Sequence, residues 1–89
     1  MVVAVIVHPI DVAKHPTVPK GFRWCAQLDT DPLNQDSWLN AGWAATKNEA
    51  ATVGEMVASA AFKALSASGI AADYLGVIYL AEDPIPGAN

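Results

Sequence analysis

The stretch TKNEAATVGEMVASAAFKALSASG, residues 46–69, decides the fold because it predicts one long helix. Its first four residues fit a capping box, in which the Thr46 hydroxyl accepts from the Glu49 amide and the Glu49 side chain reaches back to the Thr46 amide. Gly69 suits the left-handed position that closes a helix. We therefore predict a helix over about residues 47–68.

One side of this helix is predicted to pack on a sheet. At 3.6 residues per turn, one stripe beside Gly54 contains only small apolar side chains, namely Ala50, Val53, Val57, Ala60, Ala61 and Ala64. Such a stripe lets the helix lie close to the sheet, so the larger core side chains must come from the strands. Met56 and Phe62 lie at the borders of the stripe. There they can anchor a second subunit, or Phe62 can fold down over the end of the sheet.

Four strands are predicted around the helix. Residues 2–8 are apolar on both alternating faces, which is typical of a strand covered on both sides. Residues 22–29 alternate between apolar and mixed side chains, and the apolar set is Phe22, Trp24, Ala26 and Leu28. After a connection rich in turn residues at 30–37, residues 38–45 form the third strand. Residues 73–82 form the last, again apolar on both faces.

The element order is therefore β-β-β-α-β, an α/β (α+β) fold in a single domain of residues 1–89. The core spans residues 2–82, and residues 84–89 are expected to form a flexible tail. A right-handed crossover through the helix lets the last strand lie parallel to the first, which predicts a four-stranded mixed sheet in the order 3-2-1-4 with the helix on one face. The last strand is then an apolar edge, where we expect a partner.

The composition excludes several classes of protein. Hydrophobic residues make up 53% and charged residues 16%, so the chain can bury a core and does not have the composition of a disordered segment. A net charge of −4, with scattered cations, disfavours duplex nucleic acid and anionic membrane surfaces. The apolar run at residues 2–7 is too short to span a membrane and lacks the basic start of a signal peptide. We predict a cytoplasmic protein.

Chemistry-bearing motifs are sparse. The only soft or borderline metal ligands are His8, His15 and Cys25, which do not form the closely spaced pairs of a zinc site. No nucleophile-elbow or phosphate-binding glycine pattern occurs. Three carboxylates lie in or beside a turn, where Asp bonds its own backbone: Asp29, Asp31 and Asp36. We predict no enzyme, metal or cofactor; an enzyme would need His8, an Asp and Cys25 within bonding reach.

The aromatic residues are the best candidates for a contact site. Trp24 is expected in the core beneath the helix. Trp38 and Trp43 have opposite parity along their strand and should point to opposite sides, unless Gly42 bulges the chain between them, so at least one faces away from the helix. Tyr74 and Tyr79 of the last strand also have opposite parity, so they too are expected to point to opposite sides of the sheet. The predicted interface residues are Trp38, Trp43, Tyr74, Tyr79, Met56 and Phe62.

The strand and helix order resembles the opening half of the ribonuclease-H-like fold and the HicB-type antitoxin domains that reuse it. The nuclease family has a catalytic Asp in its first strand, whereas residues 2–8 contain no carboxylate and Asp11 lies beyond them. Residues 42–50 and 58–65, followed by Gly69-Ile70, resemble small accessory proteins of phages that infect high-GC actinobacteria. That resemblance implies binding to a host protein, in the host cytoplasm.

These observations predict a non-enzymatic protein that acts by self-association and protein–protein interaction, most simply as a homodimer. The reason is geometric: a chain with one helix is expected to leave the second face of an apolar sheet uncovered. The alternative is a HicB-like antitoxin or nucleic-acid-associated regulator. Its acidic charge would suit a basic toxin, and it would bind nucleic acid only through a basic surface made by an oligomer. Stacking of single-stranded nucleic acid on the aromatics is a further, disfavoured option.

Overall fold

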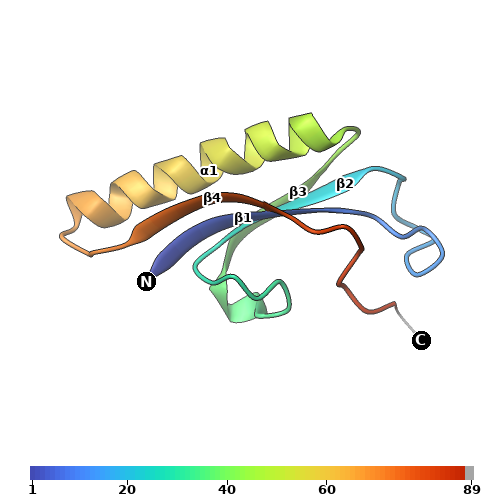
Figure 1. The fold of residues 1–89 in the computed structure, drawn as a ribbon, viewed down its shortest axis with the longest axis horizontal. Helices are drawn as coiled ribbons and strands as arrows, with labels where there is room; N and C mark the ends of the chain where they lie inside the picture. Colours follow the sequence, from blue (N-terminus) through green and yellow to red (C-terminus); the bar gives the residue numbers. More distant parts are fainter. Residues whose placement is uncertain (88–89) are drawn as a thin grey trace.

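Residues 1–87 are described by the computed structural model, and they form one four-stranded sheet with a long helix across it (Figure 1). In chain order the elements are β1 (Val2–Pro9), β2 (Phe22–Gln27), the short 3-10 helix η1 (Gln35–Ser37), β3 (Trp38–Ala44), α1 (Lys47–Ala67) and β4 (Asp73–Tyr79). The strand order is β3-β2-β1-β4, with β1 antiparallel to β2 and parallel to β4. The predicted element order and mixed sheet are confirmed.

The N-terminal cap of α1 forms only in part as predicted, because within residues 1–87 the Thr46 hydroxyl accepts its bond but the Glu49 side chain does not reach back to the Thr46 amide. Thr46 Oγ1 accepts a hydrogen bond from the Glu49 amide at 3.2 Å, which satisfies one of the free N–H groups of the first turn. At the other end Gly69 has a φ of 77°, and the Ile70 amide donates to the Leu65 carbonyl at 2.9 Å. This geometry satisfies carbonyls that the helix leaves free and turns the chain into β4.

The face of α1 that packs on the sheet differs from the predicted stripe. The buried helix residues are Ala50, Ala51, Gly54 and Ala58, whereas Val53 is 41% exposed. A Cβ at Gly54 would collide with Val5 Cγ1, so the smallest side chain lies at the closest approach. Rotation of the helix also brings Phe62 and Leu65 against the core. The predicted stripe was therefore wrong by a partial turn, because these two large side chains gain more from burial than Val53.

The core beneath the helix comes mainly from the two central strands. Val3, Val5 and Val7 of β1 are almost fully buried there. Trp24 of β2 is 6% exposed and packs in the same cluster, as predicted. Its indole lies over Gly42 of β3, where a Cβ would come within 2.7 Å of Trp24 Nε1. The glycine in β3 therefore makes room for the largest core side chain.

Two β-bulges determine which face of the sheet the aromatic side chains of β3 and β4 occupy. In β3 the register shifts so that Trp38 pairs with Gln27 and Trp43 with Arg23, which leaves Leu39 as the extra residue. Both tryptophans therefore lie on the face away from α1. A bulge between them was foreseen only at Gly42, and it lies at Leu39 instead. In an antiparallel pair, directly opposed residues lie on the same face of the sheet. One extra residue between Trp38 and Trp43 therefore brings both side chains to one face, although their positions along the strand differ in parity.

The bulge in β4 has the same effect on the tyrosines. Tyr74 pairs with Val3 and Tyr79 with Val7, because the register shifts by one residue between them. Both tyrosines consequently lie on the helix side, and the expected opposite orientation is wrong. Gly76 follows the extra residue with a φ of 78°, a conformation that glycine adopts without the strain other residues meet.

Over the two central strands the second face of the sheet is covered within the chain, which corrects the expectation of an open apolar face there. The helix-free sides of β1 and β2 are nearly inaccessible, with exposures of 0% for Ala4, 1% for Ile6, 3% for His8, 5% for Cys25 and 0% for Gln27. Figure 1 shows the β2–β3 connection and the C-terminal segment on the side of the sheet opposite α1. Irregular segments of the same chain therefore cover the surface of β1 and β2 that a second subunit was expected to cover.

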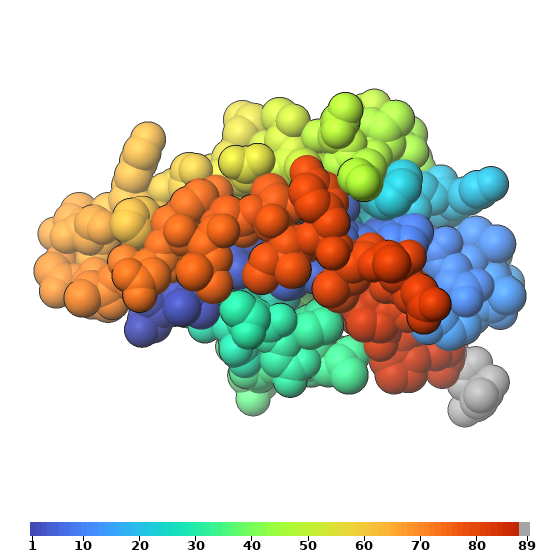
Figure 2. All heavy atoms as spheres, in the orientation of Figure 1, coloured from blue at the N-terminus to red at the C-terminus, as the bar shows by residue number. Residues whose placement is uncertain are grey.

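The C-terminal segment reaches the second face of the sheet because β4 ends earlier than predicted. That strand stops at Tyr79 rather than at residue 82, and the chain then crosses to the second face, where Asp83 is buried. In the space-filling view this red segment lies directly beside the light-blue connection after β1 (Figure 2). Residues 84–87, part of the expected flexible tail, make contacts with the connection after β1 through Ile85 and Gly87, whereas residues 88 and 89 lie outside the described residues.

Candidate functional site

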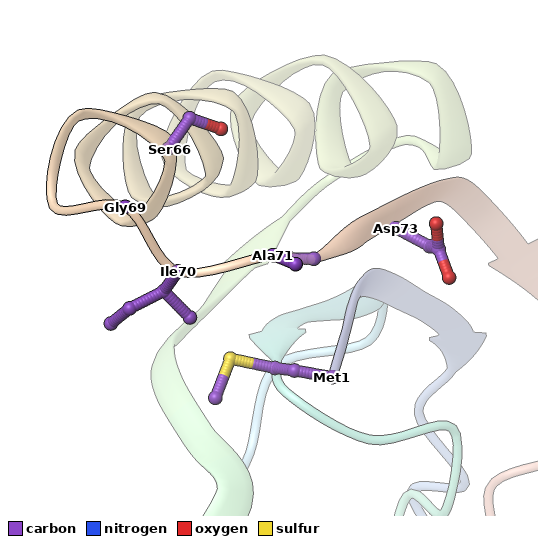
Figure 3. A pocket seen from close by; sticks show the side chains of 7 residues that line it. Met1, Ser66, Gly69, Ile70, Ala71 and Asp73 are labelled. Atoms are coloured by element: carbon purple, nitrogen blue, oxygen red, sulfur yellow. The ribbon is translucent and has the colours of Figure 1, made fainter.

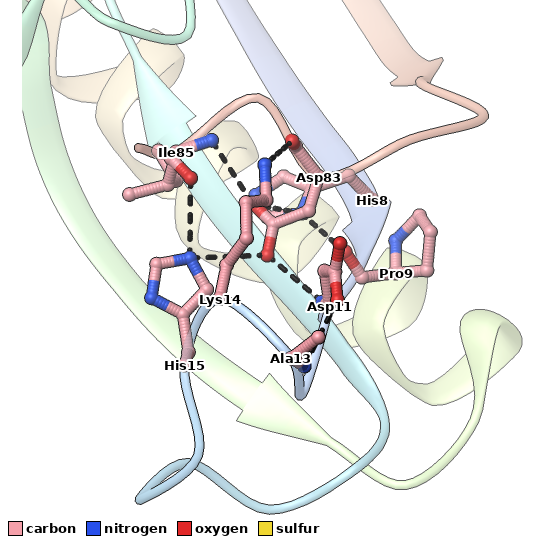
Figure 4. Close-up of polar contacts among 8 residues, drawn as sticks. All are labelled: His8, Pro9, Asp11, Ala13, Lys14, His15, Asp83 and Ile85. Carbon is pink, nitrogen blue, oxygen red and sulfur yellow. Dashed lines mark hydrogen bonds and ion pairs between the residues drawn. The ribbon is translucent and has the colours of Figure 1, made fainter. Parts of the chain in front are cut away.

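Asp83 is the centre of a buried polar cluster that joins segments far apart in the chain (Figure 4). Its side chain is 2% exposed and receives two backbone hydrogen bonds. The Asp11 amide donates to Oδ2 and the Ile85 amide donates to Oδ1, both at 3.0 Å. The carboxylate thus joins the connection after β1 to the C-terminal segment, across 72 residues of sequence.

Two histidines flank the same carboxylate. His8 Nδ1 lies 3.6 Å from Asp83 Oδ1, and His15 Nε2 lies 3.3 Å from Oδ2. Each of these nitrogens also faces a backbone carbonyl: Pro9 O at 2.8 Å from His8, and Ile85 O at 3.1 Å from His15. Carbonyl and carboxylate oxygens only accept, so each nitrogen must carry a hydrogen. Neutral histidines are therefore sufficient for the arrangement.

The charges of the cluster follow from its surroundings. Burial raises the pKa of Asp83, but the amides of Asp11 and Ile85 and the two histidines outweigh it, so the pKa lies below its ordinary value. Burial lowers the pKa of His8 by more than the Pro9 carbonyl and Asp83 raise it. At neutral pH the cluster therefore contains a charged Asp83 and an uncharged His8.

The cluster does not contain the arrangement that the sequence analysis required of an enzyme. His8 does meet an aspartate, but Cys25 Sγ is directed to the Ala26 carbonyl at 3.9 Å. Burial raises the pKa of Cys25 to about 11, so its thiol is protonated at neutral pH. Within residues 1–87, no hydroxyl or thiol is hydrogen-bonded to either histidine. The geometry does hold two backbone segments together, because the Asp83 carboxylate accepts hydrogen bonds from the Asp11 and Ile85 amides.

Sequence reasoning missed Asp83 because it lay just beyond the expected core of residues 2–82, and its partners Asp11, His8 and His15 are about seventy residues away in the chain. One local signal was available. Asp83 Oδ1 accepts from the amide two residues later, which is the Asx turn that an Asp-Pro pair favours. That turn indicates an ordered bend, but it does not indicate His8 or His15 as neighbours.

The six predicted interface residues divide into three groups by burial and packing. Trp43, Tyr79 and Met56 are exposed, at 47%, 50% and 69%. Phe62 and Tyr74 instead pack on the core and on each other, with ring centroids 5.8 Å apart in an edge-to-face arrangement. Phe62 therefore folds down onto the sheet, one of its two expected placements. Trp38 is half-buried.

Both edges of the sheet expose large apolar side chains. On β3, Leu39 and Trp43 are exposed, and on β4, Leu75 and Tyr79; of these, only the aromatics were predicted. Beside Trp43, a largely apolar hollow of about 440 Å³ lies between the end of β3 and the first turns of α1, reaching Val53. This hollow extends the apolar surface from the edge of the sheet onto the helix.

A second hollow, of about 510 Å³, lies at the other end of the helix (Figure 3). Met1, Ser66, Gly69 and Ile70 line it together with the approach to β4. Asp73 is its one acidic side chain, and it points away from the hollow's centre toward the sheet end. The hollow has no converging polar groups that would define a ligand.

Among residues 1–87, no helix combines the length and the apolarity needed to cross a membrane. In the same part of the chain, no three His, Cys, Asp or Glu side chains are grouped so as to hold a metal ion. Comparisons with protein-family models, curated proteins and solved structures found no match.

Proposed function

We propose that this protein acts through protein–protein contact at the edge strand β3, without catalysis, and that it self-associates there as a homodimer. The observation that carries the proposal is the composition of that edge. The seven residues of β3, WLNAGWA, include no charged residue and no proline, and they expose Leu39 and Trp43. An edge strand without such protection offers its free backbone groups to another strand.

The pattern of β3 suits a second copy of the same strand. An antiparallel pair with its two-fold axis at Ala41 would set Leu39 of each copy opposite Trp43 of the other. Apolar pairs directly across an antiparallel sheet are stabilising. The acidic residues that make the net charge negative all lie outside β3, so like charges would not meet along the strand.

The other edge is less suited to this role. β4 begins with the charged Asp73 and contains a bulge at Leu75, both of which discourage further pairing. Its exposed Tyr79 already has a partner, because Lys47 Nζ lies 4.9 Å from the centre of the ring. In β3 the bulge, at Leu39, lies near the start of the strand, so residues 40–44 can pair regularly and Leu39 lies at the end of the paired segment.

Sedimentation velocity at micromolar concentration tests the proposal. We expect a dimer mass for the natural chain and a monomer mass for Trp43→Lys, because a charge at this position would be buried against the partner strand. Leu33→Lys is the matched control, since Leu33 is as exposed as Trp43 and lies in the β2–β3 connection rather than in β3. Circular dichroism verifies that both variants fold. A natural chain that sediments as a monomer would refute self-association.

A host protein is a further proposed partner, and the resemblance to phage accessory proteins supports it. We propose a cytoplasmic setting, the host cytoplasm for a phage-encoded chain, which agrees with a single cysteine in the sequence. A peptide of alternating apolar residues that adds to β3 would compete with the dimer. Titration of such a peptide should therefore lower the sedimenting mass to that of one protomer with one peptide.

A second candidate is an antitoxin-like or nucleic-acid-associated regulator. The strand order β3-β2-β1-β4 with one long helix favours it, since this is the order that the HicB-type resemblance implies. Fluorescence anisotropy with labelled duplex and single-stranded oligonucleotides tests the nucleic-acid form. Binding that weakens steeply between low and physiological salt would support it. No binding at low salt would leave only a role as partner of a basic protein.

A further inference from the structure

We propose that residues 80–87 form a detachable strap, which Asp83 latches over the second face of the sheet and which is released as a unit when that carboxylate loses its charge. The strap contains no helix or strand. One backbone hydrogen bond joins it to the sheet, from the Leu80 amide to the Val7 carbonyl at 2.9 Å. Its hold on the domain beyond that point therefore depends on side chains.

Those side-chain contacts converge on Asp83. Its carboxylate accepts from the Asp11 amide, and its own carbonyl accepts from Lys14 Nζ at 2.6 Å. His15 adds contacts to both Asp83 and Ile85, each from the same ring nitrogen. Farther along the strap, Gly87 packs on Lys14 so closely that a Cβ would lie 3.2 Å from the Lys14 carbonyl oxygen. The partners all belong to β1 or to the connection after it.

The charged and titratable groups around the latch explain why its charge matters. They are His8 from β1, Asp11, Lys14 and His15 from the following connection, Arg23 from β2, which lines the same small cavity, and Glu82 within the strap. Most of those that face the carboxylate are donors or cations. A protonated Asp83 would lose acceptor capacity and would present an O–H toward N–H groups that only donate.

Release of the strap would uncover a defined patch. Asp83 and Ile85 enclose a small cavity together with Ile10, Val18 and Arg23. Ile10 is 9% exposed and His8 is 3% exposed in the latched state. Detachment would expose both while leaving the helix-covered core intact, because no residue of the strap belongs to that core. The patch lies on the second face, apart from the edge of β3.

Amide hydrogen exchange measured by NMR on the full chain tests the strap. In Asp83→Asn we expect amide protection in the strap and at Asp11 to fall by about tenfold or more, the effect of losing about one charge-assisted hydrogen bond. Protection in α1 and β1 should be unchanged. Glu82→Gln is the matched control, because it removes the same charge from an exposed neighbour and should change nothing.

The natural chain provides an independent measurement if the variant does not fold. Protection factors, which correct for intrinsic exchange, should fall in the strap as the pH drops below the ordinary range of an aspartate, while α1 stays protected. Equal loss of protection across the strap and α1, in the variant or at low pH, would show that residues 80–87 unfold only with the whole domain and would overturn the proposal. Unchanged protection in both would overturn it as well.

Discussion

The two faces of the sheet are covered by different means. On one face, α1 packs through small apolar residues against the β1 valines and Trp24, and no buried charge is involved. On the other face, irregular segments are fastened by buried polar groups. Gln27 Nε2 donates to the Asp29 and Asp31 carbonyls at 2.9 and 2.8 Å, and Asp83 holds the C-terminal segment.

The difference has a physical origin. A helix satisfies its own backbone hydrogen bonds, so it can cover a sheet with apolar contacts alone. A loop has free backbone groups, and it can cover buried surface only where polar side chains satisfy those groups. Damage to the first face should therefore lower the stability of the whole domain, and damage to the second should loosen individual segments.

The largest expected effect is on the helix-covered face. Trp24→Ala should lower the free energy of unfolding by about 3–5 kcal/mol, because it leaves a cavity beneath α1 over Gly42. Leu33→Ala is the control, a truncation at a side chain that is 52% exposed and lies outside the proposed dimer edge. Its cost in urea denaturation of the protomer should be below about 1 kcal/mol. Equal costs would mean that the core is not centred on Trp24.

A smaller, local effect is expected at the β2–β3 connection. Gln27→Ala removes both hydrogen bonds to the carbonyls of Asp29 and Asp31 and should cost about 1–2 kcal/mol. Amide exchange should accelerate most in residues 28–37, with little change in α1. Gln35→Ala, at an exposed position in the same connection, is the control. Acceleration throughout the sheet would contradict a separate role for this anchor.

The smallest effect is expected from pH, and it arises on the second face. Because the pKa of His8 is lower in the folded state, the unfolded state binds a proton first, and stability falls as the pH drops below about 6.5. Asp83, whose folded pKa is also lowered, adds a further loss below about 3.9. The urea midpoint should be constant from pH 8 to 7, slightly lower at 5.5 and clearly lower at 3.5. A midpoint that rises between pH 7 and 5.5 would contradict a neutral, buried His8.

Local signals in the sequence were sufficient for the helix and for the order of the strands. The Thr46 cap and Gly69 act within a few residues, so their structures follow directly from their spacing. The double-sided apolar pattern of residues 2–8 correctly placed β1 at the centre of the sheet. The aromatic orientations were harder to predict, because one extra residue at Leu39 reverses every later position in the strand.

By itself the sequence determined the element order, the helix ends and the central strand, because caps and apolar periodicity act over short distances. Only the tertiary structure decided how the second face is covered and where the aromatics point. The structural role of Asp83 depends on its contacts with His8 and Asp11, about seventy residues away in the chain, and no local sequence pattern predicts those contacts. The exposed edge at β3 likewise becomes visible only once its neighbours in the sheet are known.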